Sequence, residues 1–399
     1  MPHTAYIVEA VRTAGGRRNG KLSKWHPADL GAQVVDELVR RTKIDGAQVD
    51  DVIFGCVSQI GAQSANLGRG VVLSSELLPE SVPGTTVDRQ CGSSQQAIHF
   101  AAQAVMSGTQ DCVIAGGVEI MSLVPIGSNV MDGAAAGRGM PTSEGMGKRY
   151  PGVVFSQFEG AEILANRFGV KREDLDQLGY LSHQRAAAAT QNGYFEREIV
   201  PVKGYDKKAD KEIIHKVDEG IRPGVKLEKM KTLPTLKQGG VITAGTASQI
   251  CDGAAAIMIC NENGLRRLGL KPRAKIVALA LAGDDPVMML GGPIPATRNV
   301  LRKAGLTMAD MDLYEVNEAF ASVPLAWLKE LKGDLNKLNV NGGAMALGHP
   351  LGGTGAKLMT TLLHELERRG GRYGIQAICE GGGTANATII ELVSPNSRL

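Results

Sequence analysis

The 399-residue sequence has no apolar run long enough to span a membrane, and aromatic residues make up only 4% of it. Its formal net charge of +3 is too small to favour nucleic acid or a membrane surface as a partner. Hydrophobic residues account for 43% of the chain, which is ordinary for a globular protein. Glycine is abundant instead, at 51 positions, which is typical of tight turns and of close backbone approaches to a ligand.

Cysteine is scarce as well, with six residues, and no two of them form a C-x-x-C pair. This spacing argues against zinc and thioredoxin-like sites, so we expect no bound metal. A chain of this length with so few cysteines is not a disulfide scaffold, and free thiols in a reducing compartment are expected.

The ends of the chain bear on its location. The N-terminus lacks a basic stretch followed by an apolar core, so no signal peptide is expected and we predict a cytoplasmic protein. The C-terminal Ser397-Arg398-Leu399 resembles a peroxisomal address, which leaves the peroxisome as the alternative.

Strand-like and helix-like segments alternate in two parts of the chain. In the first 120 residues we expect strands at 5–11, 52–56 and 112–115 and helices at 27–43, 68–77 and 95–106. After residue 251 we expect strands at 254–260, 275–282, 312–316, 338–341, 376–379 and 387–392, and helices at 294–304, 318–329 and after Gly352. This alternation predicts parallel or mixed α/β sheet with helices on its faces.

The intervening residues have a different character, with a helix pair expected at 159–168 and 172–192 and a charged run at 203–237. The two flanking parts resemble each other in the spacing from a strand aspartate to the residue that opens a helix. This spacing is 40 residues from Asp51 to Cys91 and 37 from Asp312 to His349. We infer two similarly folded halves with a long insertion. A pseudo-twofold axis could then bring Cys91 and His349 face to face.

Cys91 lies where an extended run turns into a predicted helix. Free N–H groups at a helix start favour the thiolate, the form of cysteine that attacks carbonyl carbon. An isolated free cysteine is more often a small buried hydrophobic residue, so other segments must decide between the two interpretations.

Three later segments strengthen the chemical interpretation. Asn317 follows a predicted strand, where it would orient a water or carbonyl group or cap a helix. His349 is held between glycine and proline in a glycine-rich loop, a rigid setting that favours catalysis over a structural role. Cys379 precedes three glycines, whose N–H groups would form an oxyanion hole or simply a tight turn.

Together these motifs resemble those of the thiolase family, the acyl-CoA C-acyltransferases. The matching segments are Cys91, Asn317 in Asn-Glu-Ala-Phe, His349 in Gly-His-Pro-Leu-Gly and Cys379 in Cys-x-Gly-Gly-Gly. The similarity runs essentially from end to end and implies a five-layer αβαβα fold of two similar βαβαβαββ halves. The implied division is residues 1–121 plus 245–272 for the N-terminal half, 122–244 for an inserted loop domain, and 273–399 for the C-terminal half.

The resemblance implies ping-pong acyl transfer, as in fatty acid β-oxidation, through an acyl group on Cys91. His349 would activate that thiol, and Cys379 would exchange a proton with the α-carbon of acetyl-CoA. One oxyanion hole would consist of His349 and a water held by Asn317, and the other of the N–H groups of Cys91 and Gly381.

The thiolase pattern also implies that coenzyme A and acyl-CoA are substrates, with no permanently bound cofactor. It assigns CoA contacts to Arg222, Ala244, Ser248, Ala319 and Phe320. Thiolases are usually homodimers or homotetramers, and we expect one of these states.

Some residues depart from the family pattern. Ser156 and Gln157 stand where acetoacetyl-CoA thiolases usually carry a His-Met pair, which favours a longer or bulkier acyl group. Alternatives are an acetoacetyl-CoA-specific acetyltransferase, a decarboxylating condensing synthase of the same broad fold, and a non-catalytic lipid carrier. Cys379 disfavours the synthase, and retention of all four reacting positions argues against the carrier.

Overall fold

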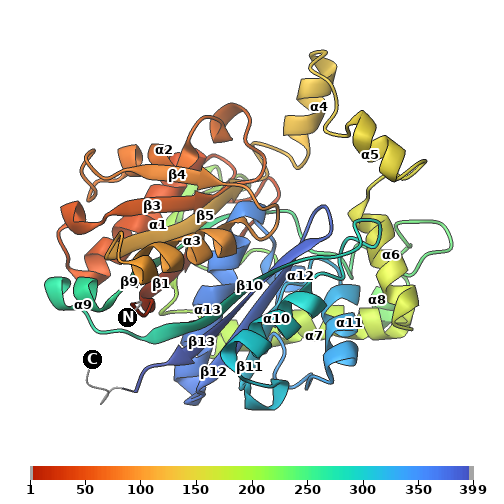
Figure 1. Cartoon of the computed structure of the whole chain (residues 1–399). Helices are drawn as coiled ribbons and strands as arrows, with labels where there is room; N and C mark the ends of the chain where they lie inside the picture. Colours follow the sequence, from red (N-terminus) through yellow and green to blue (C-terminus); the bar gives the residue numbers. More distant parts are fainter. Residues whose placement is uncertain (1–2, 395–399) are drawn as a thin grey trace.

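The computed structural model describes residues 3–394. Their main β-sheet has two halves, each called a half-sheet below (Figure 1). The first half-sheet contains β1 (Tyr6–Thr13), β3 (Asp51–Gly55), β4 (Gly84–Val87), β5 (Cys112–Ile120) and β9 (Cys251–Cys260), with β2 (Gly16–Arg17) and β6 (Ile199–Val200) at its margins. The second contains β10 (Ala274–Gly283), β11 (Leu313–Val316), β12 (Tyr373–Glu380) and β13 (Thr384–Leu392). The order is β11-β12-β13-β10-β1-β9-β5-β3-β4, and the halves join where Tyr6 pairs with Lys275 and Ile7 with Ala274.

The two half-sheets repeat one pairing pattern. In the first, β3 runs parallel to β4 and β5, and β5, β9 and β1 then alternate as antiparallel neighbours. In the second, β11 runs parallel to β12, and β12, β13 and β10 alternate in the same way. Leu338 occupies the place of β4 through one parallel bridge to Tyr314. The predicted pair of similar halves is confirmed.

Two predicted elements differ from the structure. The strand expected at 338–341 is wrong, because the chain turns at Asn339, with φ of 42°, and again at Gly342, with φ of 80°. The helix expected at 318–329 begins later, as α11 (Ser322–Leu331). Residues 319 and 320 lie outside the helix, because Ala319 is in a bend and Phe320 forms a bridge with Ala247.

Helices cover the half-sheets in layers (Figure 1). Helices α1 (Pro27–Thr42) and α2 (Leu67–Ser74) pack on the outer face of the first half-sheet, and α10 (Pro293–Ala304) and α11 on the outer face of the second. Between the half-sheets lie α3 (Ser93–Ser107) and α13 (Thr354–Arg369), in a core shared by both. Two short helices, α9 (Glu262–Leu268) and α12 (Ala344–Leu347), complete the two halves. The arrangement is the five-layer αβαβα fold expected from the sequence.

Helix α1 illustrates how local sequence produces these layers. Leu30, Val34 and Leu38 recur every fourth residue, and all three are 0% exposed. This spacing places them on one face of the helix, which packs on the first half-sheet. The His26 side chain caps the first turn by accepting a hydrogen bond from the main-chain N–H of Ala28, at 3.3 Å.

The two central helices approach each other closely at Gly355. A Cβ atom at this position would collide with the main-chain nitrogen of Gln95 and lie 2.7 Å from its Cβ. The Ser94 hydroxyl accepts a hydrogen bond from the N–H of Ala356 at 2.9 Å. Gln376 binds both helices, through Gly355 O at 2.9 Å and Gln95 Oε1 at 3.0 Å. The first turns of α3 and α13 are therefore held side by side.

The insertion contains α4 (Ser128–Ala135), α5 (Glu144–Arg149), α6 (Gln157–Arg167), α7 (Arg172–Gln191), β7 (Val202–Asp206), β8 (Lys211–His215) and α8 (Leu227–Lys231). Helices α4 and α5 project from the body of the molecule and bury none of their residues (Figure 1). The expected helix pair is confirmed as α6 and α7. Among residues 3–394, no helix is long and apolar enough to cross a membrane.

We predict that Gly355→Ala lowers stability by about 2–4 kcal/mol, because backbone and not a flexible side chain blocks the added methyl group. Thermal and urea unfolding measure this loss. Gly133→Ala in α4 is the matched control, since a Cβ there meets nothing within 4 Å. We expect the control to be neutral or slightly stabilising. A Gly355→Ala protein as stable as the wild type would show that the helices can separate without cost.

Candidate active site

Cys91 lies in a tight turn between β4 and α3. Gln90 has φ of 47°, and the N–H of Gly92 returns to the carbonyl oxygen of Arg89 at 3.1 Å. Helix α3 begins at Ser93, with Gly92 as its N-cap, so Cys91 precedes the first helical turn. Cys91 is half-buried and packs on a small apolar cluster that includes Leu351, two residues after His349. The cluster brings the Cys91 turn to the His349 loop.

The surroundings of the Cys91 thiol affect its pKa in opposite directions. Burial raises its pKa to about 12, and the nearby Glu380 carboxyl raises it further. The main-chain N–H groups of Cys91 and Gly381 hydrogen-bond the thiolate and lower the pKa, but they do not outweigh burial. In the free site, burial thus opposes the thiolate that the sequence predicts, whereas the N–H groups of Cys91 and Gly381 favour it.

Cys379 is brought to the same place from the end of β12, and its side chain is fully buried. Burial raises its pKa well above the usual value, and the neighbouring Cys91 adds to that rise. The following turn packs against the Cys91 turn, because a Cβ on Gly381 would lie 3.0 Å from Gln90 Oε1. Cys91 is thus close enough to raise the pKa of Cys379, although the two thiols are far apart in sequence.

His349 and Asn317 form the second part of the site, both almost fully buried. The Nδ2 of Asn317 lies 3.3 Å from Nε2 of His349. The Nδ1 of His349 lies 2.6 Å from the Thr354 hydroxyl, which itself donates to the carbonyl oxygen of Pro350 at 2.9 Å. This network assigns the proton to Nδ1 and leaves Nε2 as an acceptor. Asn317 does not cap a helix, because α11 begins at Ser322 with Ala321 as its N-cap.

The imidazole of His349 is neutral. Burial lowers its pKa to about 3, and the positive charge of Lys357 contributes to the decrease. Lys357 is itself buried on α13 and donates hydrogen bonds to the carbonyl oxygens of Leu347 and Gly348. It therefore holds the chain just before His349 and disfavours protonation of the ring.

Several residues of this site are absent from the sequence prediction. Thr354 orients His349, Lys357 supports its loop, and Glu119 ties that loop to the first half-sheet. The Glu119 carboxylate accepts hydrogen bonds from the N–H groups of Val57, Ser58 and Gly352, at 2.8 to 3.0 Å. Sequence signals exist for two of them, since Glu119 follows a Gly-Gly pair in a buried strand and Thr354 stands between glycines.

Four of the five predicted CoA-contact residues lie on adjoining segments. The N–H of Ser248 donates to the carbonyl oxygen of Ala319 at 2.9 Å, and Ala247 pairs with Phe320. Ala244 is exposed on the same segment as Ser248. Arg222 is exposed on a separate loop. Gln249 connects this loop to the Ser248 segment, because its side-chain Nε2 donates a hydrogen bond to the carbonyl oxygen of Gly220 at 2.9 Å.

The segment that departs from acetoacetyl-CoA thiolases borders these residues. Ser156 is the N-cap of α6, and Phe158 in the first turn packs edge-on against Phe320, with ring centroids 5.4 Å apart. Phe158 is 50% exposed and Val154 is 84% exposed, so this border presents apolar surface to solvent.

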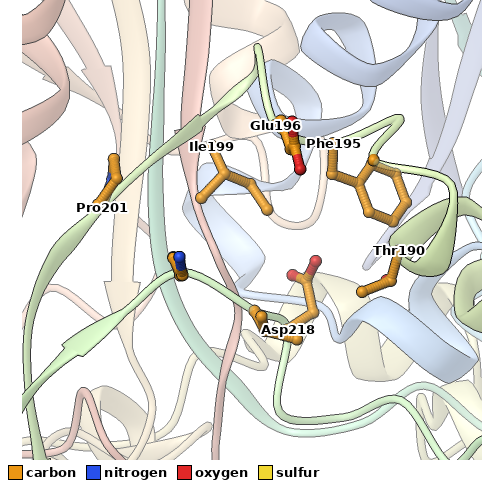
Figure 2. A pocket seen from close by; sticks show the side chains of 9 residues that line it. Thr190, Phe195, Glu196, Ile199, Pro201 and Asp218 are labelled. Carbon is orange, nitrogen blue, oxygen red and sulfur yellow. The ribbon is translucent and has the colours of Figure 1, made fainter.

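A separate cavity of about 210 Å³ lies beside the end of α7 and is lined by Thr190, Phe195, Ile199 and Asp218, among others (Figure 2). The Asp218 carboxylate binds the buried Arg12 guanidinium at 2.9 Å. The predicted site residues are not among those that line this cavity. Among residues 3–394, no group of three His, Cys, Asp or Glu side chains is placed to hold a metal ion.

Comparison with known proteins identifies the family. The model of the thiolase N-terminal domain matches residues 5–263, and that of the thiolase C-terminal domain matches residues 270–392. The chain belongs to the thiolase family, whose members act on CoA thioesters, and it is an acyl-CoA C-acyltransferase.

Individual relatives match over nearly their whole length. Steroid 3-ketoacyl-CoA thiolase of Mycobacterium tuberculosis is 53% identical, over 97% of this chain and 94% of its own. Beta-ketoadipyl-CoA thiolase of Acinetobacter baylyi is 43% identical, over 98% of this chain and 100% of its own. The crystal structure of acetyl-CoA acetyltransferase from Bacillus anthracis has a TM-score of 0.89 at 37% identity and covers 98% of this chain and 99% of that one.

We predict that Thr354→Val lowers kcat/KM for thiolysis by roughly 5- to 100-fold, because it leaves the buried Nδ1–H of His349 without an acceptor. Thr354→Ser keeps the hydroxyl and is the matched control, with activity expected within about threefold of the wild type. Steady-state thiolysis of a 3-ketoacyl-CoA measures both variants. Equal activity of the Val and Ser variants would contradict the role assigned to the hydroxyl.

Proposed function

We propose that Cys91 carries the acyl group, that His349 accepts its proton, and that Cys379 is the acid and base at the α-carbon. The observation that carries this proposal is that Cys91, Cys379 and the Gly381 N–H lie together, with the His349 loop packed beside Cys91 through Leu351. A neutral imidazole can accept a proton, and a thiol of high pKa keeps its proton until an enolate needs it.

In the cleaving direction, His349 takes the proton of Cys91, and the thiolate attacks the 3-keto carbonyl carbon. The bond between the α- and β-carbons breaks, the acyl group remains on Cys91, and the enolate of acetyl-CoA takes a proton from Cys379. Free CoA then gives its thiol proton to the Cys379 thiolate and attacks the acyl-enzyme. The bond between Cys91 and the acyl group breaks, the Cys91 thiolate takes back the proton held by His349, and the shortened acyl group leaves on CoA. Claisen condensation is the reverse, with Cys379 removing the α-proton of acetyl-CoA.

Oxyanion stabilisation follows from the same groups. The N–H groups of Cys91 and Gly381, which face the sulfur, would bind the oxygen of the tetrahedral intermediate at that carbon. His349 and a water held by Asn317 would bind the enolate oxygen. The buried Oδ1 of Asn317 has no hydrogen-bond partner among the described residues, so an acceptor is available for that water.

CoA would bind over the adjoining segments that contain Ala244, Ser248, Ala319 and Phe320, with Arg222 as the cation for its nucleotide phosphates. The charged segment at 203–237 would then cover the nucleotide. We propose that no cofactor is permanently bound and that CoA enters as a substrate in each cycle.

For the acyl group, we propose a longer or bulkier 3-ketoacyl-CoA rather than acetoacetyl-CoA. Ser156 and Gln157 replace the usual His-Met pair, and the apolar border at Val154 and Phe158 lies next to Phe320. The relative at 53% identity is named for steroid 3-ketoacyl-CoA, and others at 43% are named for beta-ketoadipyl-CoA. An acetoacetyl-CoA-specific acetyltransferase remains the alternative.

The division of the chain is also a proposal, with an N-terminal half of residues 1–121 plus 245–272, a loop domain at 122–244 and a C-terminal half at 273–399. The matching pair of half-sheets supports it. We propose a homodimer or homotetramer in the cytoplasm. Ser397-Arg398-Leu399, the alternative peroxisomal signal, lies outside the described residues.

We predict that incubation with a 3-ketoacyl-CoA in the absence of free CoA leaves an acyl adduct on Cys91, detected by peptide mass spectrometry. Cys91→Ser should lack the adduct and lose thiolysis by at least about 10³-fold. Cys379→Ser should still accept an acyl group from an acyl-CoA donor while losing turnover. Cys112→Ser, a buried cysteine outside the site, is the control. An adduct on a different residue would contradict the proposal.

We predict that kcat/KM for thiolysis rises from acetoacetyl-CoA to 3-ketoacyl-CoA thioesters with longer or ring-containing acyl groups. The apolar border supplies about 25 cal/mol for each Å² of substrate that it buries, which favours the larger groups. Loss of the enolate absorbance in a graded substrate series measures this. A maximum at acetoacetyl-CoA would favour the alternative enzyme, and no turnover of any member would overturn the proposed function.

A further inference from the structure

Glu380 is an unexplained acid in this site. It follows Cys379 at the end of β12, and its side chain is fully buried. Oε2 accepts a hydrogen bond from the Thr384 hydroxyl at 2.6 Å, whereas Oε1 has no partner among the described residues. A buried carboxylate only accepts hydrogen bonds, so an oxygen without a donor makes the charged form costly. The surroundings favour the neutral acid.

The unpartnered oxygen lies against the turn that carries Cys91. A Cβ atom on Gly92 would collide with Glu380 Oε1 and lie 2.8 Å from Nδ2 of Asn386. That Nδ2 donates to the carbonyl oxygen of Gly92 at 3.0 Å, while Oδ1 of Asn386 has no partner. Glu380 Oε1 and Asn386 Oδ1 are therefore two buried acceptor atoms without a donor beside the Cys91 turn. This shortage of donors favours a protonated carboxyl group at Glu380.

Charged groups from two elements face Glu380. Asp88 and Arg89 come from the turn after β4, and Cys379 precedes Glu380 on β12. Burial is the largest influence on the carboxyl and raises its pKa to about 7. The negative charge of Asp88 adds to this rise, whereas the Thr384 hydroxyl and the positive charge of Arg89 oppose it. Arg89 acts on the carboxyl through its positive charge, and its buried Nε has no hydrogen-bond partner among the described residues.

Glu380 acts on Cys91 in turn. After burial, it is the largest influence that raises the pKa of the Cys91 thiol, ahead of Glu119. The two acids differ in their surroundings. Glu119 accepts hydrogen bonds from three N–H groups and from the Gln63 side chain at 2.7 Å, whereas Glu380 has one donor. A change of charge beside Cys91 is therefore expected at Glu380.

We propose that Glu380 is a positioning residue that tunes the nucleophile: its carboxyl group holds a proton while Cys91 is a thiolate, and its ionisation suppresses the thiolate. The proposal rests on the proposed function in taking Cys91 as the nucleophile. Above the pKa of Glu380, its carboxylate places a negative charge beside the Cys91 sulfur and opposes loss of the thiol proton. Below it, that repulsion is absent. Glu380 acts through Cys91 and requires no contact with substrate.

The test is the rate at which iodoacetamide alkylates Cys91 between pH 6 and 8.5, read by peptide mass spectrometry for wild type and Glu380→Gln. The glutamine is close in shape and cannot ionise. We expect it to react roughly three- to tenfold faster than wild type at pH 8.5 and within about twofold at pH 6. Lowering the thiol pKa by one unit gives about ten times more thiolate, partly offset by its weaker nucleophilicity.

Two further variants make the test specific. Glu315→Gln is the matched control, because Glu315 is also buried with an unpartnered oxygen but is not among the groups that act on Cys91. Its profile should equal that of wild type. Thr384→Val removes the donor to Oε2, so the pKa of Glu380 rises and suppression should begin at a higher pH. This variant tests the proposal independently if Glu380→Gln fails to fold.

A folded Glu380→Gln enzyme with the wild-type profile, or with the same rate ratio at every pH, would overturn the proposal. Either result with intact thiolysis would leave the proposed function standing. A pH-dependent increase in alkylation without turnover of any 3-ketoacyl-CoA would instead contradict the proposed function alone, since alkylation reports the Cys91 thiolate directly.

Discussion

The contact between α3 and α13 at Gly355 is the constraint on which the rest of the site depends. With no side chain at this position, the backbone of one helix reaches the backbone of the other at Gln95. Each helix follows a turn that carries a reacting group, Cys91 before α3 and His349 before α13. Because the helices are held by their first turns, the two turns must meet, and Cys379 joins them from the end of the neighbouring β12 (Figure 1).

Burial has opposite effects on the reacting groups. It raises the pKa of Cys91 and Cys379 and lowers that of His349, so the free site holds two thiols and a neutral base. This is the uncharged arrangement that a low-dielectric site favours. Thiolate formation then depends on local donors, the N–H groups of Cys91 and Gly381, and on whether Glu380 is charged. The reactivity of Cys91 is thus governed by the contacts between its own turn and the turn that follows β12.

The architecture was largely predictable. Alternating strands and helices, the similar spacings of Asp51–Cys91 and Asp312–His349, and the glycine-rich motifs can all be read from the sequence. The repeated half-sheets confirm the two similar halves inferred from these patterns. The errors occurred where tertiary contacts override local preference. Residues 338–341 turn instead of forming a strand, and the helix expected from residue 318 begins only at Ser322, because Phe320 pairs with Ala247. The helix expected at 95–106 begins two residues earlier, at Ser93, so Cys91 lies just before it, and burial opposes the thiolate that a helix start favours.

The sequence by itself determined the family, the order of the elements, and which side chains are capable of chemistry, because these depend on local periodicity and short motifs. Only the tertiary structure decided which side chains meet and which protons they hold. Thr354 orients His349 through a hydroxyl five residues away, whereas Asn386 reaches Gly92 across 294 residues. A pKa reflects burial and the charges that surround a group in space, and those neighbours come from both halves of the chain.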